Sequence, residues 1–166
     1  MKKFIFGLLI FGFTFQSFAQ IIELPEVEIV AVNYKYLDNV READAAEPVR
    51  LLQREVAAFD LKNSEYYEDE YDNYFISFYI PQGKILASYD KEGNVLRTVE
   101  KYKNIALPRL VSEAIVKNYS GWTIAENAYL VNYHDKRGVT RKEYKILLEK
   151  DSRRMRIKTD ENGNVL

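Results

Sequence analysis

Apolar residues recur at helical spacing in two segments of the chain. The first stripe consists of Val49, Leu52, Val56 and Phe59, and the second of Leu107, Leu110, Val111, Ala114, Ile115 and Tyr119. Spacings of three and four residues place each set on one face of a helix. Pro48 and Pro108 suit the first turns of these helices, and Gly121 suits the end of the second. We therefore predict two amphipathic helices that bury their stripes against the same face of a sheet.

Alternating or β-branched segments predict a series of strands around these helices. They cover residues 26–36, 74–80, 84–89, 95–102, 123–133, 140–149 and 153–159. Pro25 suits the position just before the first of these strands. Short strands that follow one another after each helix indicate an α+β fold, with the helices packed on one face of an antiparallel sheet.

A short segment of the chain occurs twice. Residues 88–98 read SYDKEGNVLRT and residues 158–166 read KTDENGNVL. The two predicted helices start 60 residues apart and the two segments lie 70 apart, so the second unit has about ten extra residues, which we place in its hairpin around Lys136. The pattern predicts one domain over 20–166, built from two helix-plus-strands units at about 48–103 and 104–166.

The repeated segments suit tight hairpin turns better than calcium loops. Asp90 and Asp160 can accept bonds from their own turns, and Gly93 and Gly163 supply the positive φ that such turns need. An EF-hand loop needs about 12 residues and a final bidentate glutamate. Here the apolar Val95 follows only five residues after Asp90, so we predict hairpins that bind no ion.

The first 19 residues have the features of a removable export signal. Lys2 and Lys3 precede an apolar run, and small residues before Gln20 suit cleavage after Ala19. The run is too short to span a membrane, which takes about 20 apolar residues. The whole chain has no cysteine, which excludes disulfides and a cysteine-linked lipid anchor. We therefore expect a soluble protein of the periplasm or the extracellular space, neither membrane-spanning nor lipid-anchored.

The residues that carry most enzyme chemistry are scarce. Removal of the signal leaves a net charge of −3, which gives no bias toward nucleic acid. His134 is the single histidine, so sites built from several histidines are excluded. The five glycines that follow the predicted signal are all accounted for by turns and helix ends, and no phosphate-binding glycine motif occurs. We predict no catalytic residues, no metal site and no cofactor.

Two segments are candidates for contact with a partner. In residues 153–158, Met155 and Ile157 alternate with cationic residues, which predicts one core face and one cationic face; Arg97, Lys101 and Lys103 suit the equivalent strand of the first unit. A solvated sheet face is the alternative to an anion or partner site. Because tyrosine and arginine are favoured at binding hot spots, the candidate contacts are Tyr79, Arg97, Tyr133, Arg154 and Arg156. The acidic, tyrosine-rich residues 64–74 suit a solvated connection, a contact surface or, with weaker support, a divalent-cation site.

The chain resembles the PepSY-like, β-lactamase-inhibitor-like family of exported bacterial proteins. The resemblance rests on two stretches, YIPQGKILASYDKEGNVLRTVEKYKNIALPRLVSEAIVKNYSGWTI and YKILLEKDSRRMRIKTDENGNVL. It covers residues 74–166, while 48–73 matches only as a helical unit. It implies helices on one face of an antiparallel sheet in tandem units, and it implies no established catalytic residues. Some relatives carry the name nicotinate-nucleotide adenylyltransferase, but that activity needs a paired-histidine motif that this sequence lacks.

Three functions remain open on these grounds. The leading interpretation is an exported, non-enzymatic binding domain that contacts a protein or peptide of the bacterial envelope through its open sheet face. A narrower alternative is an inhibitor of an envelope protease or hydrolase, which would insert a loop such as 135–139 or 64–73 into its target. An enzyme is the third possibility, and the missing site chemistry disfavours it.

Overall fold

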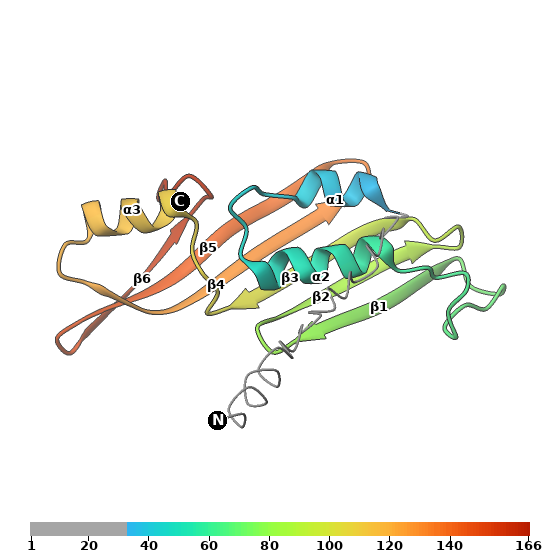
Figure 1. Cartoon of the computed structure of the whole chain (residues 1–166), viewed down its shortest axis with the longest axis horizontal. Helices are drawn as coiled ribbons and strands as arrows, with labels where there is room; N and C mark the ends of the chain where they lie inside the picture. The colour runs from blue at the N-terminus through green and yellow to red at the C-terminus, as the bar shows by residue number, and fades with distance from the viewer. Residues whose placement is uncertain (1–32) are drawn as a thin grey trace, which may run out of the picture.

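The structure, a computed structural model, describes residues 33–166, and Figure 1 shows its helices and strands. The elements are α1 (Tyr34–Val40), α2 (Glu47–Ala58), β1 (Asn73–Ile80), β2 (Gly83–Asp90), β3 (Val95–Lys103), α3 (Arg109–Asn118), β4 (Thr123–His134), β5 (Gly138–Lys150) and β6 (Arg153–Thr159). The predicted export signal at 1–19 and most of the predicted strand 26–36 lie outside the described residues.

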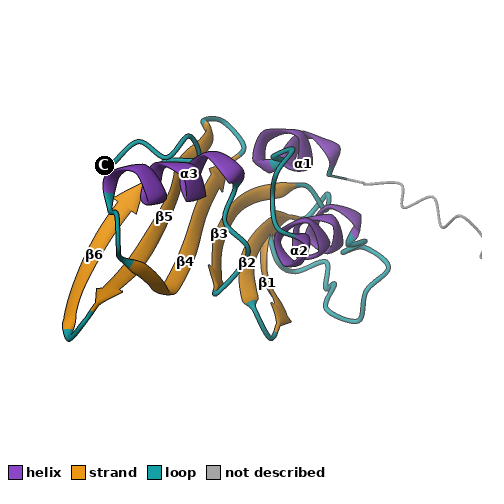
Figure 2. Ribbon diagram, turned by 60° about the vertical axis from the view of Figure 1, so that its left-hand side comes forward, coloured by secondary structure: helices purple, strands orange, loops and turns teal. Residues whose placement is uncertain are grey.

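The six strands form one antiparallel sheet in the order β1-β2-β3-β4-β5-β6. The three helices lie on the same side of this sheet, and its other face carries no element of the described chain (Figure 2). The predicted α+β class is therefore confirmed. A helix followed by three strands occurs twice in the chain order. The unit boundaries at 48–103 and 104–166 stay a prediction.

The helix-covered face of the sheet forms the core. Strand residues alternate between the two faces, and the inward ones are buried: Ile85, Ala87, Tyr89, Tyr102, Tyr129, Val131, Tyr133, Tyr144, Ile146, Leu148 and Ile157. Tyrosine supplies much of this volume. The ring of Tyr129 stacks on that of Tyr144 at 4.4 Å between centroids, and on the Tyr102 ring at 6.0 Å. Stacked aromatic rings thus provide stability that many small domains obtain from disulfides.

The helical stripes are confirmed in part. Val49, Leu52 and Val56 of α2 are buried, and Phe59 at the end of the helix is half-buried. In α3, Val111 and Ile115 are buried, whereas Ala114 is only half-buried.

The prediction that Leu110 is buried is wrong, since its exposed fraction is 42%. The ten-residue α3 contacts the core along Val111 and Ile115, four residues apart. The C-terminal turn packs against the same helix from another side. A Cβ placed on Gly163 would lie 2.7 Å from the Ala114 Cβ and 2.8 Å from the Leu110 carbonyl oxygen. The stripe is therefore divided between the sheet, the terminal turn and solvent.

The predicted strand 26–36 is wrong at its C-terminal end, because residues 34–36 belong to helix α1. The β-branched alternation stops at Val32, and beyond it Tyr36 and Val40, four residues apart, form the buried face of α1. Asn33 fixes the start of this helix. Its Nδ2 donates to the Gly93 carbonyl at 3.0 Å, and its Oδ1 accepts from the Val95 amide at 2.7 Å.

The first repeated segment is the β2–β3 hairpin turn, as predicted. The Asp90 carboxylate accepts a hydrogen bond from the Asn94 amide at 2.8 Å, and Gly93 has a φ of 89°. The second segment has the same turn, with Asp160 accepting from the Asn164 amide at 2.8 Å. It follows β6, however, and leads only to an isolated bridge between Thr159 and Val165.

The extra residues of the second half lie mainly in longer strands. β4 and β5 have 12 and 13 residues, whereas β1 and β2 have 8 each. The turn between β4 and β5 is short, so the hairpin around Lys136 is extended through its strands rather than through its loop. From residue 33 onward, no helix is long and apolar enough to cross a membrane.

Candidate binding surface

The open face of the sheet exposes a group of large apolar side chains over β1–β3. This apolar patch consists of Phe75, Tyr79, Leu86 and Val99, whose exposed fractions are 71%, 69%, 46% and 56%. Leu86 and Val99 lie directly opposite each other on neighbouring strands. Alternation places them here because their inward neighbours fill the core. A contiguous exposed apolar group is unusual on a soluble domain and often marks an interaction site.

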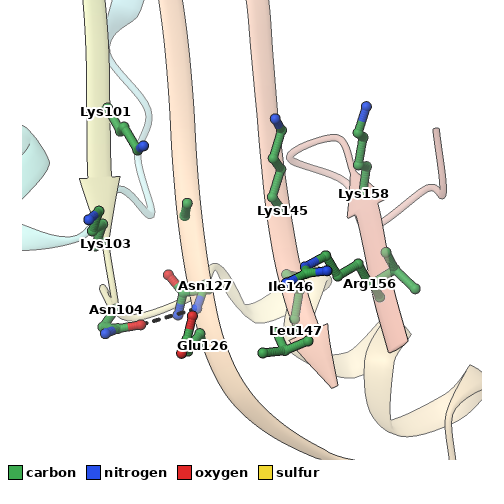
Figure 3. Close-up of a pocket in the computed structure, with 12 residues that line it drawn as sticks. Lys101, Lys103, Asn104, Glu126, Asn127, Lys145, Ile146, Leu147, Arg156 and Lys158 are labelled. Carbon is green, nitrogen blue, oxygen red and sulfur yellow. Dashed lines mark hydrogen bonds between the residues drawn. The ribbon is translucent and has the colours of Figure 1, made fainter. Parts of the chain in front are cut away.

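A basic groove lies beside the apolar patch, over β3–β6. The cations of its lining are Lys101, Lys103, Lys145, Arg156 and Lys158, around a concavity of about 420 Å³. Figure 3 shows Lys101 and Lys103 on β3, across β4 from Lys145, Arg156 and Lys158 on β5 and β6. Tyr79 pairs with Lys84, which in turn pairs with Lys101. The apolar patch and the basic groove therefore form one continuous surface.

The floor of the basic groove is formed at a small residue, Ala128, which lies between residues with long side chains. Ala128 of β4 lies opposite Lys103 on one side and Lys145 on the other, and Lys145 lies opposite Lys158. Neighbouring strands are about 4.8 Å apart. A methyl group between two lysines leaves a depression, and the half-buried Leu147 adds to its apolar lining.

One end of the groove is held by paired asparagines. The Asn104 amide donates to the Asn127 carbonyl at 2.9 Å, and the Asn127 amide donates to the Asn104 side-chain oxygen at 3.2 Å (Figure 3). Asn104 has a φ of 50°, a conformation that asparagine tolerates better than most residues. These bonds fix the exit from β3 and with it the position of Lys103.

The charges of the groove are largely unbalanced. Glu126 is the single acidic residue in its lining. Across residues 33–166, the only ion pair that involves a cation of the lining joins Lys145 to Glu143 at 3.9 Å. Close, unpaired ammonium and guanidinium groups create a positive potential that an anionic ligand would relieve.

A buried carboxylate supports the strand between the two regions. Glu100 of β3 is fully buried, and four hydrogen bonds reach its oxygens: from the Tyr36 hydroxyl at 2.8 Å, the Gln53 amide at 2.9 Å, and the Thr98 and Tyr102 hydroxyls at 3.0 Å each. Burial raises the pKa of the Glu100 carboxyl above its usual range, and the hydrogen bonds oppose that shift. This Glu100 network ties α1 and α2 to β3, whose outward residues include Val99 and Lys101.

Four of the five predicted contact residues lie on the open face, whereas the fifth does not. Tyr79, Arg97, Arg154 and Arg156 are exposed, and Arg156 lines the basic groove. Tyr133 is instead 3% exposed and packs its ring edge-on against Tyr36 at 5.3 Å. Tyr133 therefore belongs to the core and is not part of the candidate surface. A binding role for the other four stays a prediction.

The alternation of the sequence contains the signal that separates these faces. Tyr129, Val131 and Tyr133 share one face of β4, which is the core face. The predicted split of β6 is confirmed, since Ile157 is buried while Arg156 and Lys158 are exposed. The apolar patch residues Phe75, Leu86 and Val99 were not predicted, although each alternates with a buried neighbour.

The arrangement around His134 does not form a nucleophile site. Its Nδ1 lies 2.7 Å from the Asp135 carboxylate and also accepts from the Lys136 amide at 3.2 Å. The nearest serine in its row of the sheet is Ser88, and Arg97 of β3 stands between them. Two strand spacings separate Ser88 from His134 by about 10 Å, too far for proton transfer between the side chains.

The acidic stretch at 64–74 forms the connection from α2 to β1. Its tyrosines divide by role: Tyr74 is buried and Tyr67 stacks on it at 5.6 Å, whereas Tyr66 and Tyr71 are more than half exposed. No group of three or more histidine, cysteine or acidic side chains that could hold a metal ion occurs from residue 33 onward. The contact role of this stretch stays a prediction.

Comparison with known proteins gives a distant likeness. No family model matches the sequence, and no curated protein is similar to it. Among solved structures, the crystal structure of a BLIP-like protein from Bacteroides fragilis is similar, with 18% identity and a TM-score of 0.33 over 60% of this chain and 68% of that one. At this level the likeness carries no argument about function, which must come from the surface itself.

Proposed function

We propose that this protein is an exported, non-enzymatic binding domain of the PepSY-like, β-lactamase-inhibitor-like kind, and that its open sheet face contacts a protein or peptide. The proposal includes removal of residues 1–19 as a signal and a location in the periplasm or outside the cell. The observation that carries it is the apolar patch, in which four large side chains stay exposed beside a dense group of cations.

The physical basis of this proposal is that helices cover only one of the two faces of the sheet. Three helices cover one face, while the other leaves Phe75 and Tyr79 about 70% exposed. Burial of apolar surface is worth roughly 25 cal/mol per Å², so covering these rings would stabilise a complex. Tyrosine and arginine, present on this face as Tyr79 and Arg97, are enriched at protein-binding hot spots.

In-cell crosslinking followed by mass spectrometry of captured proteins tests this proposal. The double variant Phe75→Ala with Val99→Ala removes the centre of the apolar patch. Val116→Ala is the matched control, because Val116 is 75% exposed but lies on α3, on the helix side of the sheet. We expect the double variant to lose a partner that both the wild type and Val116→Ala retain. Equal capture by all three proteins, each shown to be folded by thermal melting, would contradict the proposal.

Inhibition of an envelope protease or hydrolase is a narrower form of the same function. The observation that favours it is the 64–74 connection, which projects beyond the start of β1 and exposes Tyr66 and Tyr71 (Figure 1). An inhibition screen against envelope hydrolases separates the two forms, because a simple binder leaves the rates of those enzymes unchanged.

A further inference from the structure

We propose that the basic groove binds an extended, acidic polypeptide segment, with an apolar side chain of that segment seated over Ala128 and its carboxylates against the flanking cations. This inference rests on the proposed function and specifies the chemistry of the partner. It concerns the basic groove over β3–β6, not the apolar patch over β1–β3.

The charge of the occupant follows from the lining. Within the described part of the chain, five cations surround the concavity and Glu126 is the one acidic residue of its lining. Lys103 and Lys145 stand on opposite sides of Ala128, two strand spacings or about 10 Å apart. Their flexible side chains can converge on one carboxylate between them, or each can contact a separate one. Among residues 33–166, Lys103 has no ion pair and Lys145 has only the long one to Glu143 at 3.9 Å, so an anionic occupant would satisfy charges that are weakly compensated.

The apolar part of the occupant follows from the floor. Ala128 and Leu147 both line the concavity and are half-buried, which leaves apolar surface beneath the charged rim. A free phosphate or a bare polyanion would cover the rim and leave this floor in contact with water. A peptide with an apolar residue flanked at two positions on either side by acidic residues meets both requirements, because residues two apart in an extended chain point to the same side.

A polypeptide fits better than a nucleic acid for a second reason. The rim has four lysines and one arginine, and among residues 33–166 its lining includes no exposed aromatic ring on which bases could stack. The exposed rings of the open face, those of Phe75 and Tyr79, lie on the edge strand β1. The mature chain is also slightly acidic overall, unlike most nucleic-acid-binding domains.

Fluorescence polarisation with the labelled seven-residue peptide Ser-Glu-Ser-Leu-Ser-Glu-Ser, whose leucine and two glutamates share one side, tests the inference directly. Parallel probes are the peptide with glutamine in place of glutamate and a seven-nucleotide oligothymidylate. Ala128→Phe fills the depression without a change of charge, and Lys103→Gln and Lys145→Gln remove its flanking cations. Lys117→Gln is the control for lost charge, because Lys117 is exposed on α3 and lies on the helix side of the sheet.

We expect the acidic peptide to bind the wild type, with a Kd at least about tenfold weaker in Ala128→Phe and about fivefold weaker in each groove lysine variant. Lys117→Gln should stay within about twofold of the wild type, and added salt should weaken binding. Equal binding of Ala128→Phe and the wild type would overturn the inference, since attraction to charge alone needs no depression. So would tighter binding of the oligothymidylate, or salt-sensitive self-association that the groove variants abolish.

Failure here and failure of the proposed function are distinguishable. If no groove variant affects the peptide while Phe75→Ala with Val99→Ala still loses its crosslinked partner, the open face binds a protein but the groove does not recognise acidic segments. If the peptide binds as expected and no partner depends on the apolar patch, the groove recognises acidic segments, but the proposal that the apolar patch binds a protein fails.

Discussion

Replacing Glu100 by alanine should destabilise the protein strongly, because it removes the shared acceptor of four buried donors. The Tyr36, Thr98 and Tyr102 hydroxyls can rotate and bond to one another in part, but the Gln53 amide has no other acceptor among its present bonds. A buried donor without a partner costs about 1–3 kcal/mol. We count two unsatisfied donors, the Gln53 amide and one of the three hydroxyls, together with a small cavity. The expected loss in the free energy of unfolding is then about 4 kcal/mol, out of a total of about 5–15 kcal/mol for a domain.

Urea unfolding of the wild type, Glu100→Ala and Glu126→Ala measures this loss. Glu126 is exposed on β4, so its replacement should stay within about 0.5 kcal/mol. The slope of free energy against urea must be the same in all three for the comparison to hold. A loss below about 1 kcal/mol in Glu100→Ala would refute the reasoning. It would mean that the free-energy cost of burying the carboxyl is as large as the stabilisation from its four hydrogen bonds.

The same network predicts a pH dependence with a defined sign. Burial raises the pKa of the folded Glu100 carboxyl above the value of about 4.3 in an unfolded chain. The folded state therefore keeps a proton on Glu100 that the unfolded state loses. The contribution of Glu100 to the free energy of unfolding is fully present below about pH 4.3 and declines as pH rises through the folded pKa. Glu100→Gln cannot titrate there. Its stability relative to the wild type should improve with rising pH, and a constant difference from pH 4 to 8 would contradict the shift.

Further predictions concern the turns and the single histidine. Gly93→Ala should lower stability by about 1 kcal/mol in a thermal melt, because its φ of 89° is strained for any residue with a Cβ. Gly163→Ala should cost more, since its Cβ would also meet Ala114 at 2.7 Å. Asp90→Asn should change the melting temperature little, with calcium or with chelator, because asparagine keeps the acceptor for the Asn94 amide. Purified protein should not turn over ATP and nicotinate mononucleotide; robust turnover abolished by His134→Ala would contradict a binding role.

The periodicity of the sequence was sufficient to locate most elements. Every predicted strand from residue 74 onward is present within a few residues of its expected ends, because alternation over six or more residues is typical of a half-buried strand. The α2 stripe at Val49, Leu52 and Val56 is buried for a similar reason. The Asp90 turn also follows locally, since both its side-chain bond and its glycine lie within five residues.

Other features needed contacts between distant parts of the chain. Glu100 and Lys101 look alike as charged residues of a strand, yet one is enclosed by α1, α2 and β3 while the other faces solvent. Two of the four donors that permit this burial, Gln53 and Tyr36, come from residues 47 and 64 positions away. Leu110 was misjudged because the C-terminal turn, rather than the sheet, packs beside it. Such outcomes depend on which surfaces meet after folding, and local spacing does not contain that information.

The candidate surface shows the same division. The sequence alone determined that β6 has a cationic face, because Arg154, Arg156 and Lys158 alternate with Met155 and Ile157. Only the tertiary structure decided that Lys103 of β3 and Lys145 of β5 flank Ala128 of β4. A groove is a property of strand order and register, which bring together side chains 42 residues apart in the chain. Alternation fixes the face on which each residue lies, and the pairing of the strands fixes its neighbours.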